Sequence, residues 1–358
     1  MSKQHLTIST FLGVLVALTV VVSAAPADDP GRRELNGTIW VANRGAHTIR
    51  GFEARAGSLV TTVAMRASSQ PGDLAYAKGK LYVAEEFGSP PAIAIVDAAS
   101  GVVLQRIFTG PRPHHVHASV GGNLMAYGVF GSNKVGIIDT HTDALLGEWT
   151  ASTNSAARSH AGVFSPDGRT VYVANDVVNE LAAVDPRTGE LLWTMTVPFA
   201  HELIVTHNGK TAYVSGRAGS ALHVVDLERH EIVRTIPLGP MPDTFGLSAN
   251  EKLLTVALRG TPAQVAIVDT ATLEYDIVTI AGTGTIAGHQ WTSPNGHFTY
   301  AAFEGQGAGV AVIDHNRNNQ VVQTLDYPGR PHGVDFARGY ARVFACSRVV
   351  RTDTPDLA

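Results

Sequence analysis

Short apolar runs recur along the chain at spacings of 41 to 47 residues. Each run combines β-branched, aromatic and small residues, as in Val-Tyr-Val-Ala at 171–174, a composition that favours strands. The runs begin at Ile39, Leu81, Leu124, Val171, Ala212, Leu253 and Phe298. Because the same pattern returns at a nearly constant period, the chain is predicted to consist of repeated structural units.

One repeat shows what a unit contains. A glycine-containing turn at Pro186–Gly189 separates two of its apolar segments, and no helical period of 3.6 is sustained after residue 25. Strands are predicted over residues 170–175, 180–185, 191–197 and 201–205. Four short antiparallel strands in a unit of this length predict an all-β fold, a seven-bladed β-propeller with four strands in each blade.

The ring is predicted to close by combining both ends of the chain. The last inner strand, residues 332–336, would join the strands that begin at Ile39 and so complete the seventh blade. Residues 342–347 look like one more strand, either an extra outer strand or the start of a further unit. Eight blades is therefore the alternative.

The second apolar run of most repeats ends in aspartate. An Asp side chain there accepts hydrogen bonds from backbone N–H groups two residues on, so we expect these residues to stabilise turns. They are Asp97, Asp139, Asp185, Asp226, Asp269 and Asp314.

Four features of the repeat resemble the YVTN-type β-propeller repeat. They are the strand Val171–Asn175, the Val-Asp pair at 184–185, the Thr-Gly turn at 188–189 and the Ser-Pro-Asp-Gly hairpin at 165–168. The resemblance covers most of residues 38 to 340 and implies the propeller fold. It leaves function open, because propellers include binding modules, lyases, lactonases and metalloenzymes.

The N-terminal segment has the features of a secretory signal peptide. Lys3 and His5 precede an apolar run from Phe11 to Val22, which small residues follow at 23–25. We predict a signal peptide over residues 1–25, a linker over 26–37, the propeller over 38–347 and a C-terminal tail over 348–358. The mature protein would be secreted or periplasmic and would have no membrane segment; an uncleaved anchor is the alternative.

Charge and cysteine content narrow the possible partners. The formal net charge is −4 without long charge runs, so nucleic acid is not an expected partner. Cys346 is the only cysteine, so the chain forms no internal disulfide, and this residue is expected to pack in the core. The alternative is that Cys346 has a free thiol that binds metal or acts in redox chemistry. We expect the protein to be a monomer.

A histidine or aspartate stands where each inner strand begins. Because the inner strands of a propeller line its central channel, these side chains are predicted to meet at one mouth, next to the ends of the second strands. The inner-strand set is Asp73, His114 or His115, His160, His201, Asp243, His289 and His332. The second-strand set stands at the ends of the strands that begin at Ile39, Leu81 and their equivalents. It includes Arg44, Glu85, Glu86, Asn175, Asp176, Arg217, Arg259 and Glu304.

This arrangement suggests a transition-metal site. Imidazole suits copper, zinc and iron; a His-only set favours copper or zinc, whereas two His with Asp73 or Asp243 would suit non-haem iron. The candidate metal ligands are His114, His115, His160, His201, His289 and His332, with Glu85, Glu86 or Glu304 orienting them. His117 could join the site. The alternative is a polar channel rim without metal.

Three functions remain open at this point. The first is an exported propeller that binds a small molecule or protein partner at the funnel, with or without a transition metal. The second is a metalloenzyme, either a copper or iron oxidoreductase or a metal-assisted lyase or hydrolase. The third is a metal-free, lactonase-like hydrolase with a histidine base. The remaining histidines, including His223 and His230, are expected at the surface.

Overall fold

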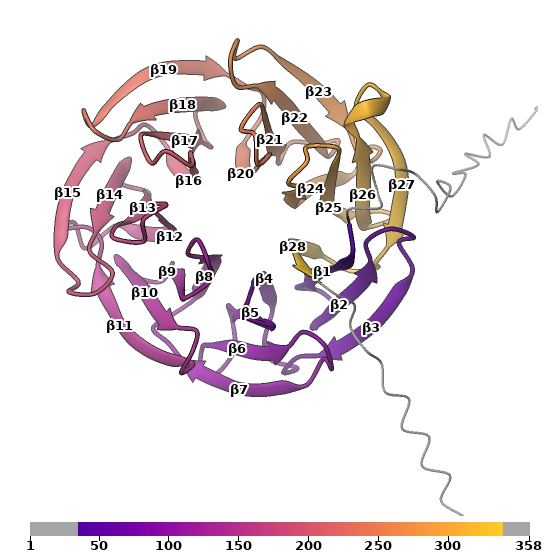
Figure 1. The fold of residues 1–358 in the computed structure, drawn as a ribbon, viewed down its shortest axis with the longest axis horizontal. Coiled ribbons are helices and arrows are strands. Elements are labelled where there is room, and N and C mark those ends of the chain that lie inside the picture. The colour runs from indigo at the N-terminus through magenta and orange to yellow at the C-terminus, as the bar shows by residue number, and fades with distance from the viewer. Residues whose placement is uncertain (1–34, 339–358) are drawn as a thin grey trace, which may run out of the picture.

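The computed structural model describes residues 35–338, which form seven four-stranded antiparallel sheets around a common axis (Figure 1). The predicted seven-bladed, all-β propeller is confirmed, and the eight-bladed alternative is wrong for this part of the chain. Within these residues the helical element is one short 3-10 turn, η2 (His315–Arg317). The blades therefore have to supply the core and the channel.

The strands fall into four concentric positions. The innermost are β4 (Pro71–Ala77), β8 (Pro113–Ala118), β12 (Arg158–Phe164), β16 (Ala200–Val205), β20 (Pro242–Leu247), β24 (Thr285–Thr292) and β28 (Pro331–Arg338). The second are β1 (Gly37–Asn43), β5 (Lys80–Glu85), β9 (Leu124–Val129), β13 (Val171–Asp176), β17 (Thr211–Gly216), β21 (Leu253–Leu258) and β25 (Phe298–Gly305). The third are β2 (Thr48–Glu53), β6 (Ala92–Asp97), β10 (Lys134–Asp139), β14 (Glu180–Val184), β18 (Ala221–Asp226), β22 (Gln264–Asp269) and β26 (Gly309–Asp314). The outermost are β3 (Leu59–Ala64), β7 (Val103–Phe108), β11 (Ala144–Thr150), β15 (Leu191–Thr196), β19 (Glu231–Pro237), β23 (Tyr275–Thr279) and β27 (Gln320–Asp326).

The ring closes where the two ends of the described chain meet. Strand β28 pairs antiparallel with β1, from Gly37 opposite Arg338 to Asn43 opposite Pro331. In Figure 1 the yellow strand β28 accordingly lies in the same sheet as the indigo strand β1. The predicted closure is confirmed, and it pairs a strand edge that would otherwise be open.

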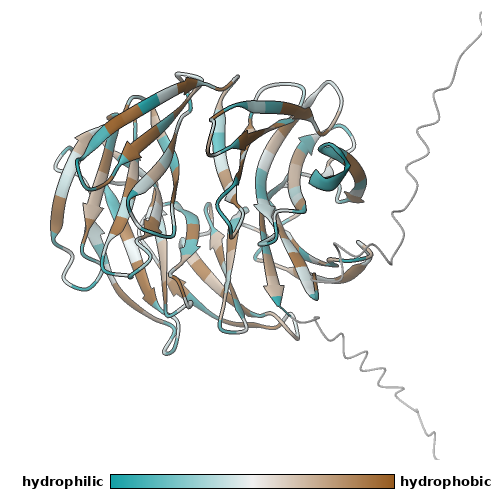
Figure 2. Cartoon of the chain, turned by 45° about the horizontal axis from the view of Figure 1, so that its top comes forward, coloured by the Kyte–Doolittle hydropathy of each residue, from teal (hydrophilic) through white to brown (hydrophobic). Residues whose placement is uncertain are grey.

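The core lies between blades. Seven clusters of buried apolar side chains occur in the described residues, and each fills the space between two neighbouring sheets. A second strand is therefore covered on both faces: every residue of β1 is buried. An outer strand such as β15 alternates between partly buried and exposed residues. Figure 2 shows apolar stretches running along the strands of the blades.

The recurring aspartates stabilise turns as predicted. Asp185 Oδ1 accepts from the backbone N–H groups of Arg187 and Thr188 at 2.7 and 3.1 Å, and Asp139 binds the N–H groups of His141 and Thr142 in the same way. These carboxylates lie in turns at the ends of third strands.

Several predicted segments lie outside the described residues. They are the signal peptide 1–25, most of the linker 26–37, the possible strand 342–347 with Cys346, and the tail 348–358. In the part of the chain that the structure describes, no helix has the length and apolar character needed to cross a membrane.

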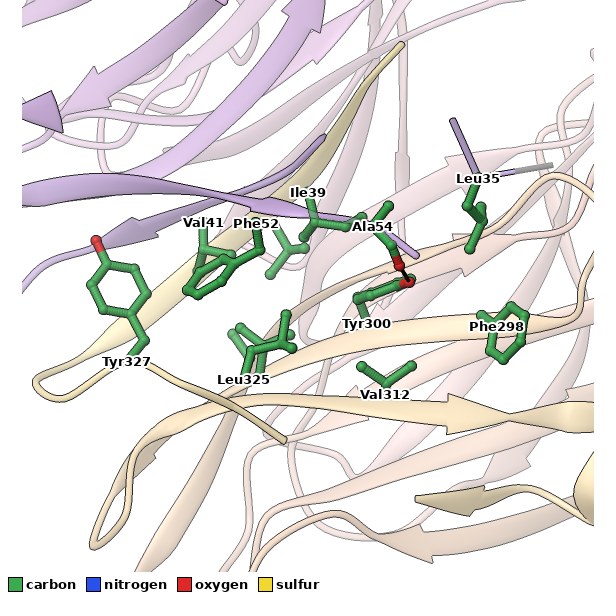
Figure 3. Close-up of a cluster of buried hydrophobic side chains, with 13 residues drawn as sticks. Leu35, Ile39, Val41, Phe52, Ala54, Phe298, Tyr300, Val312, Leu325 and Tyr327 are labelled. Carbon is green, nitrogen blue, oxygen red and sulfur yellow. Dashed lines mark hydrogen bonds between the residues drawn. The ribbon is translucent and has the colours of Figure 1, made fainter. Parts of the chain in front are cut away.

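The closure interface generates a stability prediction. Tyr300 of β25 is 1 % exposed, packs between the last and first blades, and donates its hydroxyl to the Ala54 carbonyl (Figure 3). Replacing Tyr300 by Ala should lower the free energy of unfolding by about 3–5 kcal/mol, because it leaves a cavity and an unpaired carbonyl. Urea denaturation measures the change. Tyr275→Ala is the control, since Tyr275 also donates to a backbone carbonyl but is 38 % exposed. Equal losses for the two variants would contradict the assignment.

Candidate functional site

A β-bulge interrupts every inner strand at the predicted His/Asp position. In β8, Pro113 lies opposite Val129 and Val116 opposite Tyr127, so two histidines at 114–115 face one glycine. The same slip occurs in all seven described blades. Because a bulge breaks the strand's regular alternation, it lets consecutive side chains turn toward the channel. This resolves the choice between His114 and His115: both belong to the channel.

The bulges bring the predicted inner-strand residues into one buried layer. Neighbouring imidazole rings have centroids 3.6–4.3 Å apart and form a continuous row from His201 through His160, His115 and His289 to His332. His114 packs against the row and places its Nε2 3.1 Å from Nε2 of His160. All six candidate histidines, together with Asp73 and Asp243, are buried.

Four of these histidines make a hydrogen bond between Nδ1 and a carboxylate. An acceptor at Nδ1 fixes the orientation of the ring and leaves Nε2 as the nitrogen available to a ligand. The pairs are His115 with Glu202, His289 with Asp73 at 3.0 Å, His332 with Glu304 at 3.0 Å and His201 with Asp176 at 3.2 Å. Nδ1 of His114 lies 3.0 Å from Glu86, and Nδ1 of His160 lies 3.7 Å from Glu202, but neither makes a hydrogen bond there.

Burial keeps most of the imidazoles neutral. It lowers the pKa of His114 to about 4, and Glu86 offsets only part of this effect. Burial also holds the pKa of His160 and of His332 well below the usual value, with neighbouring cationic groups adding to it, and it lowers the pKa of His289. Neutral imidazole is the form that binds metal ions.

Two of the partner carboxylates, Asp73 and Glu202, stay ionised despite burial. Burial alone would raise the pKa of Asp73, but His289 and other neighbours lower it to about 2. Likewise His115, His117 and His160 hold the pKa of Glu202 well below its usual range. The layer therefore combines neutral rings with fixed negative charges, a favourable setting for a cation.

His201 has a different environment. Its Nδ1 lies 3.2 Å from Asp176, while its Nε2 faces both Asp243 Oδ1 at 2.9 Å and Arg217 Nη1 at 2.7 Å. Burial lowers its pKa, but the hydrogen bonds to the two aspartates outweigh burial, and the pKa is raised. His201 is therefore suited to proton transfer rather than to metal binding.

The histidine layer separates two cavities. The one at the mouth, called the funnel, has a volume of about 260 Å³; the one below, called the lower chamber, has about 330 Å³. His115 lines both. The funnel also contains Arg44, Glu86, Phe87, Arg112, His114, Phe130, His160, Asp176, His201, Arg217, Asp243, Arg259, Arg330 and His332. The lower chamber includes Asp73, His117, Glu202, Gln290, His289 and Asp335.

The predicted second-strand residues divide between these places. Arg44, Glu86, Arg217 and Arg259 line the funnel. Glu304 lies behind it, paired with His332, Arg259 and Arg330. Glu85 lines neither cavity; its buried carboxylate binds Arg106 of its own blade and Arg66, which lies in the connection between β3 and β4. The structure therefore does not support Glu85 as a site residue.

Two further histidine expectations have definite outcomes. His117 lies in the lower chamber, with Nε2 3.5 Å from Glu202 Oε1, and so adjoins the site. The expectation that His223 lies at the surface is wrong. It is 4 % exposed and is held by the Pro198 carbonyl and the Thr235 hydroxyl, each 3.0 Å away.

Sequence reasoning missed several site residues. Glu202 follows His201 directly, as His115 follows His114, so the position after the recurring His/Asp was the available signal. Arg112 and Arg330 stand immediately before the prolines that open β8 and β28. The residue before the inner strand lines the funnel in three of the described blades, as Gln70, Arg112 and Arg330.

Among residues 35–338, three groups of side chains have ligand atoms close enough together to hold a metal ion. In each group the atoms lie within 4.8 Å of one another, and His115 belongs to all three. The groups are His114–His115–His160, His115–His289–His332 and His115–His117–Glu202.

Comparison with known families agrees with this architecture. Residues 41–249, more than half of the chain, match the family described as YNCE-like beta-propeller. The chain belongs to this family.

Curated relatives of this YNCE-like propeller match only a short stretch. The uncharacterized protein YncE of Salmonella typhi is 25 % identical over 92 residues, 26 % of this chain and 26 % of that protein. The protein of the same name from Salmonella typhimurium gives the same values. The chain thus spans about a quarter of the length of the curated relatives it matches.

Solved structures share the fold at low sequence identity. Hydrazine synthase of Kuenenia stuttgartiensis aligns with a TM-score of 0.66 and 20 % identity, over 78 % of this chain and 92 % of that chain. A putative 6-phosphogluconolactonase of Bacteroides uniformis gives 0.67 and 16 %, over 84 % and 100 %. The dihydro-heme d1 dehydrogenase NirN, in complex with DHE, gives 0.60 and 15 %, over 84 % and 75 %. These similarities establish the fold alone.

The buried histidines of this YNCE-like propeller predict acid sensitivity. The pKa of His114 falls from 6.5 to about 4 on folding, so its contribution to stability is complete above pH 6.5 and is lost as the pH falls toward 4. In metal-free protein, protonation of His114 as the pH falls across that interval should lower the free energy of unfolding by about 3 kcal/mol. Urea titrations in EDTA measure it. Substitution His114→Gln should flatten the decline, whereas the exposed-site control His141→Gln should not; an unchanged decline in the first variant would contradict the assignment.

Proposed function

We propose that this propeller binds one transition-metal ion in its channel through His115, His289 and His332, and that the ion faces a ligand-binding funnel. One observation carries the proposal: the three rings converge, and each has Nδ1 against a different carboxylate. Metal-binding histidines are typically oriented by such acceptors. Nε2 of His289 is buried without a hydrogen-bond partner, which is costly unless a ligand occupies that side.

The other two candidate groups have weaker support. In the first, His114 and His160 already face each other through their Nε2 atoms at 3.1 Å, so a metal would replace that contact. In the third, Glu202 serves as the partner of His115 Nδ1, an orienting role rather than a ligand role. All three share His115, so the proposal is for a single ion.

The donor set favours copper or zinc over iron. Asp73 accepts from His289 and from the Val116 N–H at 3.0 Å, and Asp243 faces His201 and Arg259. Neither aspartate is free to complete a two-His, one-carboxylate iron site. A three-His set leaves an open coordination position for a ligand. Two ligand nitrogens on one ion lie about 3.3 Å apart, so loading requires side-chain shifts on the order of 1 Å.

The location of the protein is also part of the proposal. The predicted signal peptide over residues 1–25 supports export to the periplasm or the exterior. There the protein would act as a metal-dependent binding protein or metalloenzyme for a small molecule that enters through the funnel.

Metal analysis tests the proposal. Full-length protein prepared without a His tag and reconstituted with copper, zinc or iron(II) should retain about one equivalent of copper or zinc. The substitution His289→Ala should weaken binding by at least about tenfold, because it removes a ligand, and Glu202→Gln by about 10- to 100-fold, because it removes an orienting acceptor.

A matched control separates ligand loss from general damage. His223 is equally buried but lies outside the channel, so His223→Ala should leave metal affinity unchanged. Retention of less than about a tenth of an equivalent of every metal would refute the site. Equal losses in His289→Ala and His223→Ala would refute the ligand assignment.

A second candidate function is a metal-free hydrolase. His201, held between Asp176 and Asp243 beside Arg217, is suited to act as a general acid or base, and putative 6-phosphogluconolactonases share the fold. Hydrolysis of δ-gluconolactone in a pH-stat distinguishes the candidates. The second candidate predicts activity that persists in EDTA and falls by about a hundredfold or more in His201→Gln. Activity abolished by EDTA contradicts it.

A further inference from the structure

Three large apolar side chains lie at one side of the funnel rim. Val177 follows β13, while Phe199 and Met241 immediately precede β16 and β20. They are 67 %, 47 % and 41 % exposed. Large apolar side chains gathered at one edge of a polar cavity are unusual on a protein surface and indicate a binding function.

The backbone of these three residues has an unfavourable conformation. The φ angles of Val177, Phe199 and Met241 are 75°, 55° and 52°, in the left-handed region that non-glycine residues rarely adopt. For β-branched Val177 this conformation is especially unfavourable. Such outliers concentrate at ligand-binding sites, where the surrounding structure maintains them.

The apolar residues line a groove of about 320 Å³ that continues into the funnel. Asp176 and Arg217 belong to both cavities. A small molecule can therefore place one part in the apolar groove and another in the funnel, close to the histidine layer.

The funnel end of this path is cationic. Five arginines and three carboxylates line the funnel. Glu304, which lies behind it and pairs with Arg259 and Arg330, is a fourth carboxylate, so one positive charge remains in excess before any metal binds. Among the described residues, no ion pair within 4.0 Å joins Arg112 or Arg217 to a carboxylate. Arg112 lies over the rings of Phe87 and Phe130, and Nε of Arg217 is buried without a hydrogen-bond partner.

We propose that the funnel binds a small amphiphilic organic anion, a carboxylate with an apolar chain or ring. Its carboxylate would pair with Arg217 and Arg112, and its apolar part would lie against Val177, Phe199 and Met241. Arg guanidinium groups bind carboxylates through two parallel hydrogen bonds, which gives orientation as well as affinity. The inference rests on the proposed function in placing the anion beside the metal and names the class of ligand for that site.

Calorimetric titration with matched probes tests the inference on the full-length protein. Hexanoate carries both features, acetate only the charge and 1-hexanol only the chain. Hexanoate should bind at least about tenfold more tightly than either, because only it uses both cavities. Arg217→Gln and Arg112→Gln should each weaken hexanoate binding by about tenfold or more. The substitution Phe199→Ser should weaken hexanoate binding and leave acetate unchanged.

Controls come from residues of the same types outside the funnel. The exposed Arg187 and Phe108, changed to Gln and Ser, should leave hexanoate binding unchanged. Hexanoate that binds no more tightly than acetate, or that is insensitive to the Arg217 and Phe199 substitutions, would overturn the inference. Because metal content is measured separately, metal retention without hexanoate binding contradicts only the anion site. Hexanoate binding without metal retention contradicts only the metal site.

Discussion

The antiparallel pairing of β28 with β1 is the contact on which the channel depends. Each blade contributes one or two side chains to the histidine layer, and no blade alone supplies all the ligands of a candidate metal group. Only a closed ring points all seven bulged strands at the same axis. The interface that enforces closure is apolar, with Tyr300, Phe298 and Tyr327 buried between the last and first blades. Hydrophobic packing at the periphery thus supports a polar centre that would not assemble by itself.

The bulges explain how a narrow channel accommodates so many ionisable groups. Regular alternation would turn every second residue into the neighbouring sheet interface. The slip at each inner strand instead brings adjacent residues, such as His201 and Glu202, to the axis. The partner strand must leave space for the extra residue of the bulge. Gly128 stands opposite the His114–His115 bulge, and a Cβ there would lie 2.4 Å from the His160 carbonyl oxygen.

The sequence allowed the fold, its closure and the recurring His/Asp position to be predicted, because repeat period and strand composition are local properties. Glu86 and Glu304 were predicted to orient histidines, and they lie beside His114 and His332. The pairing of His115 with Glu202 and of His289 with Asp73 could not be predicted, because each pair joins two different blades. His115 is 87 positions before Glu202, and His289 is 216 positions after Asp73. Glu85 and Glu86 illustrate the limit. They are adjacent where β5 ends, but Glu85 pairs with Arg66 and Arg106 away from both cavities, whereas Glu86 faces the funnel. The direction of each side chain depends on where the strand ends.

Charge is arranged in layers along the channel axis, and this order links the two proposed sites. Carboxylates such as Glu202 and Asp73 contact the histidines from the lower chamber, where they favour a cation. The arginines lie on the funnel side, where they favour an anion. Reversing the order would place an anion against Glu202 and a metal ion against Arg217, both of which are repulsive. Under the two proposals, the observed order would draw a carboxylate ligand from the mouth toward the open side of a histidine-bound cation, and the apolar groove beside Arg217 would determine which end of the ligand enters first.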